Sequence, residues 1–348
     1  MKIKNNFSLS IIRHLPKCTK DYLVSKICPR EFNMLVMDIA SSCNAKCPFC
    51  ARKCLESPPQ GFMDEFVFES IFNQVKRSPK IQRISLYAFG EPLLNPNAGK
   101  YIRQLSSLKR TLVLSTNSTN LEKFYDELML LDILQFSIEG CDKQSYEQNR
   151  AGLKFEHTIS RLKEFDARIR ERRLRNLHTP HRFLHCLLTK QTNIQKFIEC
   201  WGAFVDEIRF SVLGPHLIHN NNDIAEFTYP PNMESDCFKF DMRASTRNCA
   251  YIQNAITINS NGDAVMCCSD FDQTIKLGDY KDLKEAFNNK FLHDLHTRMT
   301  LGESHRCIGC RVFRDFNKND VLKYFPELNN LEKSDLAKKY KISIRGLL

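Results

Sequence analysis

The chain of 348 residues has the length of about two domains, and its 42% hydrophobic and 26% charged residues are typical of globular proteins. No apolar run approaches the roughly 18 residues that a membrane span needs, and the basic N-terminus has no apolar segment long enough for a secretory signal. The composition excludes collagen-like, disordered and membrane-spanning classes, and we expect a cytoplasmic protein.

The net charge of +11 is unevenly distributed, with basic residues in excess in segments 1–30, 161–176 and 311–348. A basic stretch without interleaved aromatic residues is most often a solvated helix face or a loose arm. No nucleic-acid-binding motif accompanies these stretches, so we expect no nucleic-acid partner. A basic face would also attract an acidic redox partner.

Between residues 31 and 215, short apolar runs alternate with longer segments of helical periodicity. The apolar runs predict six strands, at residues 34–40, 81–88, 111–115, 133–138, 183–188 and 207–213. The other segments predict helices at residues 64–75, 97–108, 121–130, 156–172 and 193–204. Strands that alternate with helices are usually parallel and joined by right-handed crossovers. We therefore expect an α/β fold, an open sheet or a partial barrel, with its functional residues at the carboxyl ends of the strands.

The pattern changes after residue 215. Two short strands, 255–259 and 264–268, flank Asn261 and Gly262, which predict a tight type I′ hairpin turn. Two helices, 283–288 and 291–299, are expected next. The expected segments are a basic arm (1–30), the barrel (31–215), a polar linker (216–236), a cysteine-rich hairpin and helix extension (237–315) and a charged, partly helical tail (316–348).

Fifteen cysteines are unusual in a chain expected to remain in the reducing cytoplasm, where they are more often metal ligands than disulfides. Cys43, Cys47 and Cys50 follow the first predicted strand with the spacing C-x3-C-x2-C. Three thiolates on one loop can hold three irons of a [4Fe–4S] cluster and leave the fourth iron open. Cys54 offers an alternative, a four-thiolate zinc site, although structural zinc sites favour two separated pairs.

This loop resembles that of the radical SAM superfamily, which has an aromatic residue, here Phe49, before the last cysteine. Further motifs similar to those of the family follow in order at the ends of predicted strands. The first is Phe89-Gly90-Glu91-Pro92, which is similar to Gly-Gly-Glu-Pro with Phe89 in place of the first glycine. Asn117 lies where the family has Thr-Asn-Gly, and Ser137-Ile138-Glu139-Gly140 is similar to Ser-Leu-Asp-Gly. Arg150 matches an arginine that is frequent in the family.

The resemblance implies a partial (β/α)6 TIM-like barrel that binds S-adenosylmethionine (SAM). In such a barrel, Glu91 and the backbone near Gly90 would hold the methionine amino group, Arg150 the carboxylate, and Ser137 and Glu139 the ribose. Enzymes of this family cleave SAM reductively and use the 5′-deoxyadenosyl radical to abstract hydrogen from a substrate. A flavodoxin or ferredoxin is the expected electron donor, and the basic surface suits such an acidic protein.

A second group of cysteines lies downstream and has ligand spacing of its own. The expected ligands are Cys249, Cys267, Cys307 and Cys310. This layout resembles the SPASM extension of the same family, or its shortened twitch form, which carries auxiliary [4Fe–4S] clusters. No cysteine follows the last of the four, so we expect one auxiliary cluster. Cys237 is an alternative to the first ligand, and Cys268 to the second, although neighbours on a strand point to opposite faces.

The same four cysteines also fit a zinc site, because spacing alone does not distinguish zinc from iron. Two hypotheses follow: a radical SAM enzyme acting on a peptide, a protein or a sugar- or nucleoside-type small molecule, and a zinc-stabilised basic binding module without turnover. Asp270, three residues after Cys267, is expected to be a surface-loop carboxylate, with a proton acceptor for the substrate as the alternative. The remaining cysteines are expected to be small buried hydrophobic residues: Cys18, Cys28, Cys141, Cys186 and Cys200. His185, His216 and His219 are expected to be structural or exposed residues and not ligands.

Overall fold

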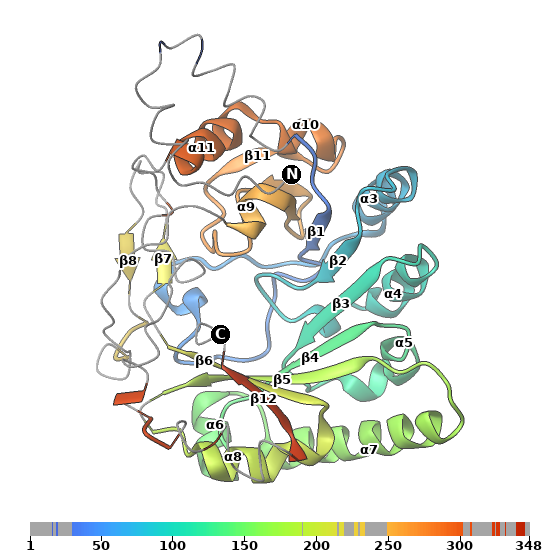
Figure 1. The fold of residues 1–348 in the computed structure, drawn as a ribbon, viewed down its shortest axis with the longest axis vertical. Coiled ribbons are helices and arrows are strands. Elements are labelled where there is room, and N and C mark those ends of the chain that lie inside the picture. The colour runs from blue at the N-terminus through green and yellow to red at the C-terminus, as the bar shows by residue number, and fades with distance from the viewer. Residues whose placement is uncertain are drawn as a thin grey trace.

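The computed structural model describes residues 30–189, 191–213, 216–218, 226–228, 230–233, 249–301, 322–323, 325–327 and 339–344, together with residues 16, 19, 307 and 331. Six parallel strands pair in the order in which they occur along the chain (Figure 1). They are β1 (Met34–Met37), β2 (Arg83–Leu86), β3 (Thr111–Thr116), β4 (Ile133–Ser137), β5 (His181–Leu188) and β6 (Glu207–Val212). The fold is therefore α/β, with the curved parallel sheet of a partial TIM-like barrel, as predicted.

Helices on the outer side of the sheet connect these strands (Figure 1). They are α3 (Glu65–Arg77), α4 (Ala98–Ser106), α5 (Tyr125–Leu128), α6 (Lys143–Asn149), α7 (Phe155–Leu174) and α8 (Ile194–Trp201), with 3-10 turns η1 (Ala51–Cys54), η2 (Pro92–Leu94), η3 (Leu121–Lys123) and η4 (Gly202–Phe204). The sequence did not predict α6, because it buries only Tyr146 and has no apolar stripe. Its first turn is stabilised by a capping box between Asp142 and Ser145.

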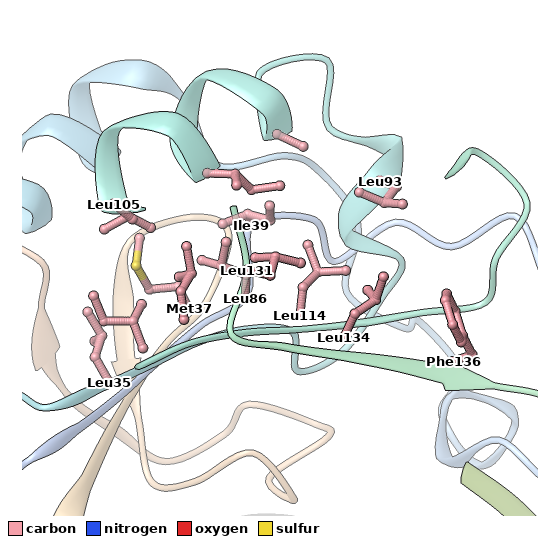
Figure 2. Close-up of a cluster of buried hydrophobic side chains, with 14 of the residues drawn as sticks. Leu35, Met37, Ile39, Leu86, Leu93, Leu105, Leu114, Leu131, Leu134 and Phe136 are labelled. Carbon is pink, nitrogen blue, oxygen red and sulfur yellow. The ribbon is translucent and has the colours of Figure 1, made fainter. Parts of the chain in front are cut away.

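The core lies between the sheet and these helices (Figure 2). Alternate strand residues, such as Leu35 and Met37 on β1 and Leu114 on β3, lie beneath Leu105 of α4 and are fully buried. Full burial of such a side chain stabilises the fold by about 1.5–3 kcal/mol. The residues between them face the inner side of the barrel, where Ser115 on β3 is only half-buried. The two-residue period of each strand thus separates a dry outer core from a more polar inner face.

The C-terminal extension continues the same sheet. Strand β9 (Ala255–Ile258) pairs in parallel with β1, and β10 (Asp263–Val265) and β11 (Lys276–Asp279) follow in antiparallel order. Helices α9 (Ala250–Asn254), α10 (Leu283–Phe287) and α11 (Lys290–Leu301) pack on this edge. The predicted strands and helices of the extension are therefore present, and they lie directly against the first barrel strand.

The hairpin turn differs from the type I′ turn predicted for Asn261 and Gly262. Only Gly262 of the two has a positive φ, at +90°, whereas a type I′ turn needs positive φ at both central residues. The Asn259 side chain accepts hydrogen bonds from the amides of Asn261 (3.0 Å) and Asp263 (2.9 Å). This side chain holds the turn in a wider form in which a single glycine takes the left-handed position.

Two further strand pairs lie in segments expected to be irregular. Strands β7 (His216–Ile218) and β8 (Glu226–Thr228) form an antiparallel pair within the expected linker. In the expected tail, β12 (Lys341–Ile344) pairs in parallel with β6. Strand β12 thus covers β6 at one end of the sheet, and β11 forms the opposite end.

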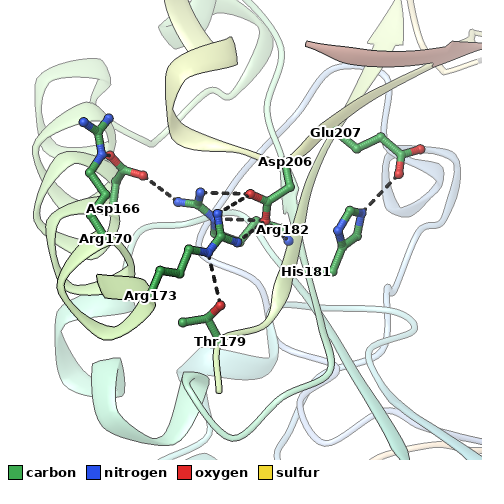
Figure 3. Close-up of polar contacts among 8 residues, drawn as sticks. All are labelled: Asp166, Arg170, Arg173, Thr179, His181, Arg182, Asp206 and Glu207. Atoms are coloured by element: carbon green, nitrogen blue, oxygen red, sulfur yellow. Dashed lines mark hydrogen bonds and ion pairs between the residues drawn. The ribbon is translucent and has the colours of Figure 1, made fainter. Parts of the chain in front are cut away.

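Charged residues at the amino ends of β5 and β6 form an ion-pair network with α7 (Figure 3). Buried Arg182 pairs with Asp166 at 2.7 Å and with Asp206 at 3.2 Å. Burial opposes ionisation of Asp206, but Arg173 and Arg182 outweigh it and hold the pKa of that carboxyl below its usual value. Arg170 of α7 also pairs with Asp166, so acids neutralise part of the basic stretch 161–176.

Candidate functional site

The loop after β1 brings the three thiols of the C-x3-C-x2-C motif together. Cys47 is buried, and Cys43 and Cys50 are half-buried. Burial raises the pKa of Cys47 to about 12 and also raises that of Cys43, and the nearby Cys50 contributes to both shifts. No three His, Cys, Asp or Glu side chains in the described part of the chain have the spacing to hold a single metal ion. A cubane cluster holds its thiolates farther apart than one ion does.

A buried cation lies beside these thiols. The guanidinium of Arg150 donates a hydrogen bond from Nη1 to Cys47 Sγ at 3.6 Å, and its Cζ lies 5.5 Å from the centre of the Phe49 ring. A positive charge there stabilises the thiolate, the form that ligates metal. Three neighbouring thiols and a buried cation therefore fit a negatively charged iron–sulfur cluster with three protein ligands.

Two residues outside the motif fix the backbone of this cluster-binding loop (residues 41–63). Arg52 of η1 donates from Nη1 to the carbonyl oxygens of Ser41 and Pro59, each at 2.7 Å. His216 of β7 is buried, and its Nε2 donates to the Phe49 carbonyl oxygen at 2.8 Å. Neither residue was expected in the site from the sequence. The position of Arg52 between Cys50 and Cys54 is the one sequence signal that could have indicated it.

Gly90 and Glu91 lie at the carboxyl end of β2, directly beside the cluster-binding loop. A Cβ at position 90 would lie 2.3 Å from the Ala40 carbonyl oxygen, so only glycine fits. The Glu91 amide donates to the Ser42 carbonyl oxygen at 2.9 Å. The loop after β2 therefore packs closely against the backbone of the cluster-binding loop at position 90, with Phe89 in place beside it.

The buried carboxylate of Glu91 joins the ends of β2 and β3. Its Oε1 accepts from Thr116 Oγ1 and its Oε2 from the Asn117 amide, both at 2.7 Å. Burial raises the pKa of Glu91 to about 6, although these hydrogen bonds oppose the shift. The Asn117 side chain donates to Asn44 Oδ1 at 2.7 Å, which ties β3 to the cluster-binding loop.

Ser137 and Glu139 follow at the end of β4. Ser137 Oγ lies 3.3 Å from Ser115 Oγ on the inner face of the barrel. Glu139 forms a buried ion pair with Arg150 and accepts from the Leu187 amide at 3.3 Å. The resemblance implies that Glu139 binds the ribose of SAM and that Arg150 binds its carboxylate. In the structure the two side chains also contact each other directly.

The second group of cysteines is described in part. Cys249 precedes α9 and its Sγ accepts from the Ile252 amide at 3.4 Å, and Cys267 follows β10 and its Sγ accepts from the Ser269 amide at 3.4 Å. Cys249, Cys267 and Cys307 are buried. The alternative ligand Cys268 is half-buried, whereas Cys310 and Cys237 lie outside the described residues.

Asp270 is fully buried, so the expectation of a surface carboxylate is wrong. Burial raises its pKa well above the usual value, and neighbouring Asp272 raises it further. The loop after β10 folds back on itself, with the Asp270 amide donating to the Cys267 carbonyl oxygen at 3.1 Å. Sequence spacing did not indicate this burial, because it depends on how the loop folds in space.

Family models match both parts of the chain. Residues 37–192 match the radical SAM superfamily, and residues 249–311 match the SPASM iron–sulfur cluster-binding domain. Among solved structures, SuiB of Streptococcus suis bound to S-adenosylmethionine has a TM-score of 0.58 at 14% identity, over 79% of this chain and 69% of that chain. The structure of anSMEcpe with bound AdoMet has a TM-score of 0.56 at 17% identity, over 86% and 99%. Likeness at such low identity shows the fold.

Two curated relatives match shorter segments. A tungsten-containing aldehyde ferredoxin oxidoreductase cofactor-modifying protein of Pyrococcus furiosus is 30% identical over 108 residues, 30% of either chain. An S-adenosyl-L-methionine-dependent 2-deoxy-scyllo-inosamine dehydrogenase of Niallia circulans is 24% identical over 110 residues, 31% of this chain and 44% of the relative. The matches therefore span less than half the length of either relative.

A partial barrel with three neighbouring thiols at its carboxyl edge, extended by a second cysteine-bearing unit, defines a class of iron–sulfur enzymes. Residues 37–192 are therefore a radical SAM domain, and residues 249–311 are a SPASM-type extension. The two family models imply SAM, a [4Fe–4S] cluster and auxiliary iron–sulfur clusters as cofactors, so the zinc-stabilised binding module is set aside. In the described residues, no helix combines the length and the apolar character that a membrane span requires.

Proposed function

We propose that this enzyme abstracts hydrogen from a substrate held between the barrel and the extension, and that Cys43, Cys47 and Cys50 ligate the SAM-binding cluster. The observation that carries the proposal is the buried Arg150 guanidinium, 3.6 Å from Cys47 Sγ in a loop with two further thiols. When bound, the clusters supply an electron that cleaves SAM to the 5′-deoxyadenosyl radical and an acceptor for the electron left on the substrate.

The protein residues bind and orient SAM in this proposal. Gly90 lets the loop after β2 pack against the cluster-binding loop. The backbone near Gly90 and the carboxylate of Glu91 hold the methionine amino group. Arg150 binds the methionine carboxylate, and Ser137 and Glu139 bind the ribose. Asn117 holds the end of β3 against the cluster-binding loop through Asn44. Fixed groups of this kind hold the reacting atoms close together and keep water out.

We further propose that Cys249, Cys267, Cys307 and Cys310 ligate one auxiliary [4Fe–4S] cluster. The three of these that are described are buried, as ligands of a closed site should be. The substrate is proposed to be a peptide or protein, or a sugar- or nucleoside-type molecule. A likeness in fold to SuiB, solved with its precursor peptide, supports the first class, and the name of the Niallia circulans relative supports the second.

Anaerobic reconstitution tests the first cluster. With dithionite and SAM, the wild-type protein should release 5′-deoxyadenosine, measured by mass spectrometry, and Cys47→Ala should release none. Cys54→Ala is the matched control, because Cys54 lies in the same loop and is not a proposed ligand. Release by Cys47→Ala, or its loss in Cys54→Ala alone, would contradict the ligand assignment.

Iron and sulfide counts test the auxiliary cluster. The wild-type protein should hold about eight irons, four for each cubane, and Cys267→Ala about four. Cys268→Ala should keep the full count, because Cys268 is only half-buried and is not a proposed ligand. Equal iron in the wild-type protein and Cys267→Ala would refute the auxiliary ligand set. Candidate peptides and polyols are then compared by their ability to stimulate release of 5′-deoxyadenosine.

A further inference from the structure

The phenylalanine that replaces the first glycine of the family motif contacts the extension. The Phe89 side chain is only 4% exposed, and its ring meets the ring of Phe271 edge to face, with 5.9 Å between centroids. Phe271 lies in the loop after β10, four residues beyond Cys267. The substitution thus joins the SAM-site loop after β2 to the loop that follows a proposed auxiliary ligand.

Phe271 reaches the cluster-binding loop by a second contact. Its ring meets the imidazole of His216 at 5.9 Å between centroids, with 68° between the planes. His216 in turn donates to the carbonyl oxygen of Phe49, the residue before Cys50. One side chain of the extension therefore contacts Phe89 directly and the cluster-binding loop through His216.

The backbone of Phe89 is held independently of its ring. Its amide donates to Asp38 Oδ1 at 3.1 Å, and its carbonyl oxygen lies 3.5 Å from Arg52 Nη1. The steric need for glycine falls on Gly90, where a Cβ would meet the Ala40 carbonyl. The loop after β2 therefore does not require the Phe89 ring for its own conformation, and the ring is available for the contact with Phe271.

We propose that Phe89 and Phe271 are positioning residues that couple the SAM site to the loop carrying Cys267. Because the loops after β1 and β2 hold SAM, ordering them by SAM also orders Phe271 and its loop. Coupling between two sites is reciprocal and here depends on this contact. Without the contact, the loop carrying Cys267 should no longer respond when SAM binds. The proposal rests on SAM binding at this site and is independent of the substrate.

Hydrogen–deuterium exchange of the reconstituted enzyme, with and without SAM, measures this coupling. In the wild-type protein, SAM should slow amide exchange in both segments, 43–50 and 267–275. In Phe271→Ala and Phe89→Gly, slowing should persist in 43–50, whereas exchange in 267–275 should rise about tenfold and no longer respond to SAM. Phe271→Tyr keeps the ring and should behave as the wild-type protein does.

Phe66→Ala is the matched control. Phe66 also makes an edge contact between barrel and extension, with Tyr280 at 6.2 Å, but it lies in the first turn of α3 and is 74% exposed. This variant should keep the response to SAM in both segments. The proposal would be overturned if SAM still slowed exchange of segment 267–275 in Phe271→Ala. It would also be overturned if SAM slowed exchange of segment 43–50 but not of segment 267–275 in the wild-type protein. No response in 43–50 would instead count against the SAM site itself. If Phe89→Gly does not fold, Phe271→Ala decides.

Discussion

Replacement of Glu139 by Gln tests the buried ion pair beside Cys47. Glu139 is 3% exposed and its partner Arg150 is 8% exposed. Removal of one partner of a buried pair leaves the other charge uncompensated and costs about 3–5 kcal/mol. A typical domain has only about 5–15 kcal/mol of unfolding free energy. Glu139→Gln should therefore lower the urea midpoint of the cluster-free protein substantially.

The single tryptophan of the chain provides the assay. Trp201 Nε1 donates to the carbonyl oxygen of Gly140 at 2.8 Å, so its fluorescence reports the segment next to Glu139. Coincident fluorescence and circular dichroism transitions would justify a two-state free energy. Glu171→Gln is the control, because Glu171 pairs with Arg175 at the surface and its loss should leave the midpoint unchanged.

A double variant separates the charge from the contact. Glu139→Gln combined with Arg150→Met removes both charges, and apolar replacement of a buried pair is often nearly neutral. The double variant should therefore be more stable than Glu139→Gln alone. Equal urea midpoints for Glu139→Gln and the wild-type protein would refute the reasoning, because no buried charge would then have lost a necessary partner.

Three further predictions concern the same site. Burial raises the pKa of Glu91 from 4.5 to about 6, so the folded state binds its proton more tightly than the unfolded state. The free energy of unfolding should then fall by about 2 kcal/mol as the pH rises from about 4.5 to 6. In Glu91→Gln, the urea midpoint should not show this fall over the same pH range. Gly90→Ala should abolish SAM binding in calorimetry, since its Cβ would lie 2.3 Å from the Ala40 carbonyl oxygen, and unchanged affinity would contradict the close approach. Reduction by a flavodoxin should slow as salt rises if the docking is electrostatic, and a salt-independent rate would exclude it.

The sequence determined the strands and the first cysteine motif. Apolar runs such as 133–138 and 207–213 predicted β4 and β6 to within a residue, because a strand buried on its outer face needs that local pattern. The order of Gly90, Glu91, Asn117 and Ser137 predicted a shared edge, since parallel strands end on the same side of a sheet. Residue spacing is sufficient for such features because they depend on neighbours in the chain.

Tertiary structure decided which distant segments meet. The apolar pattern predicted β9 but not its parallel pairing with β1, and no pattern predicted β12 or its pairing with β6. The burial of Asp270, the contact of Phe89 with Phe271 and the hydrogen bond from His216 all join segments far apart in sequence. Burial and partner choice depend on how separate elements pack in space, and a local pattern carries no record of which distant side chain will face it.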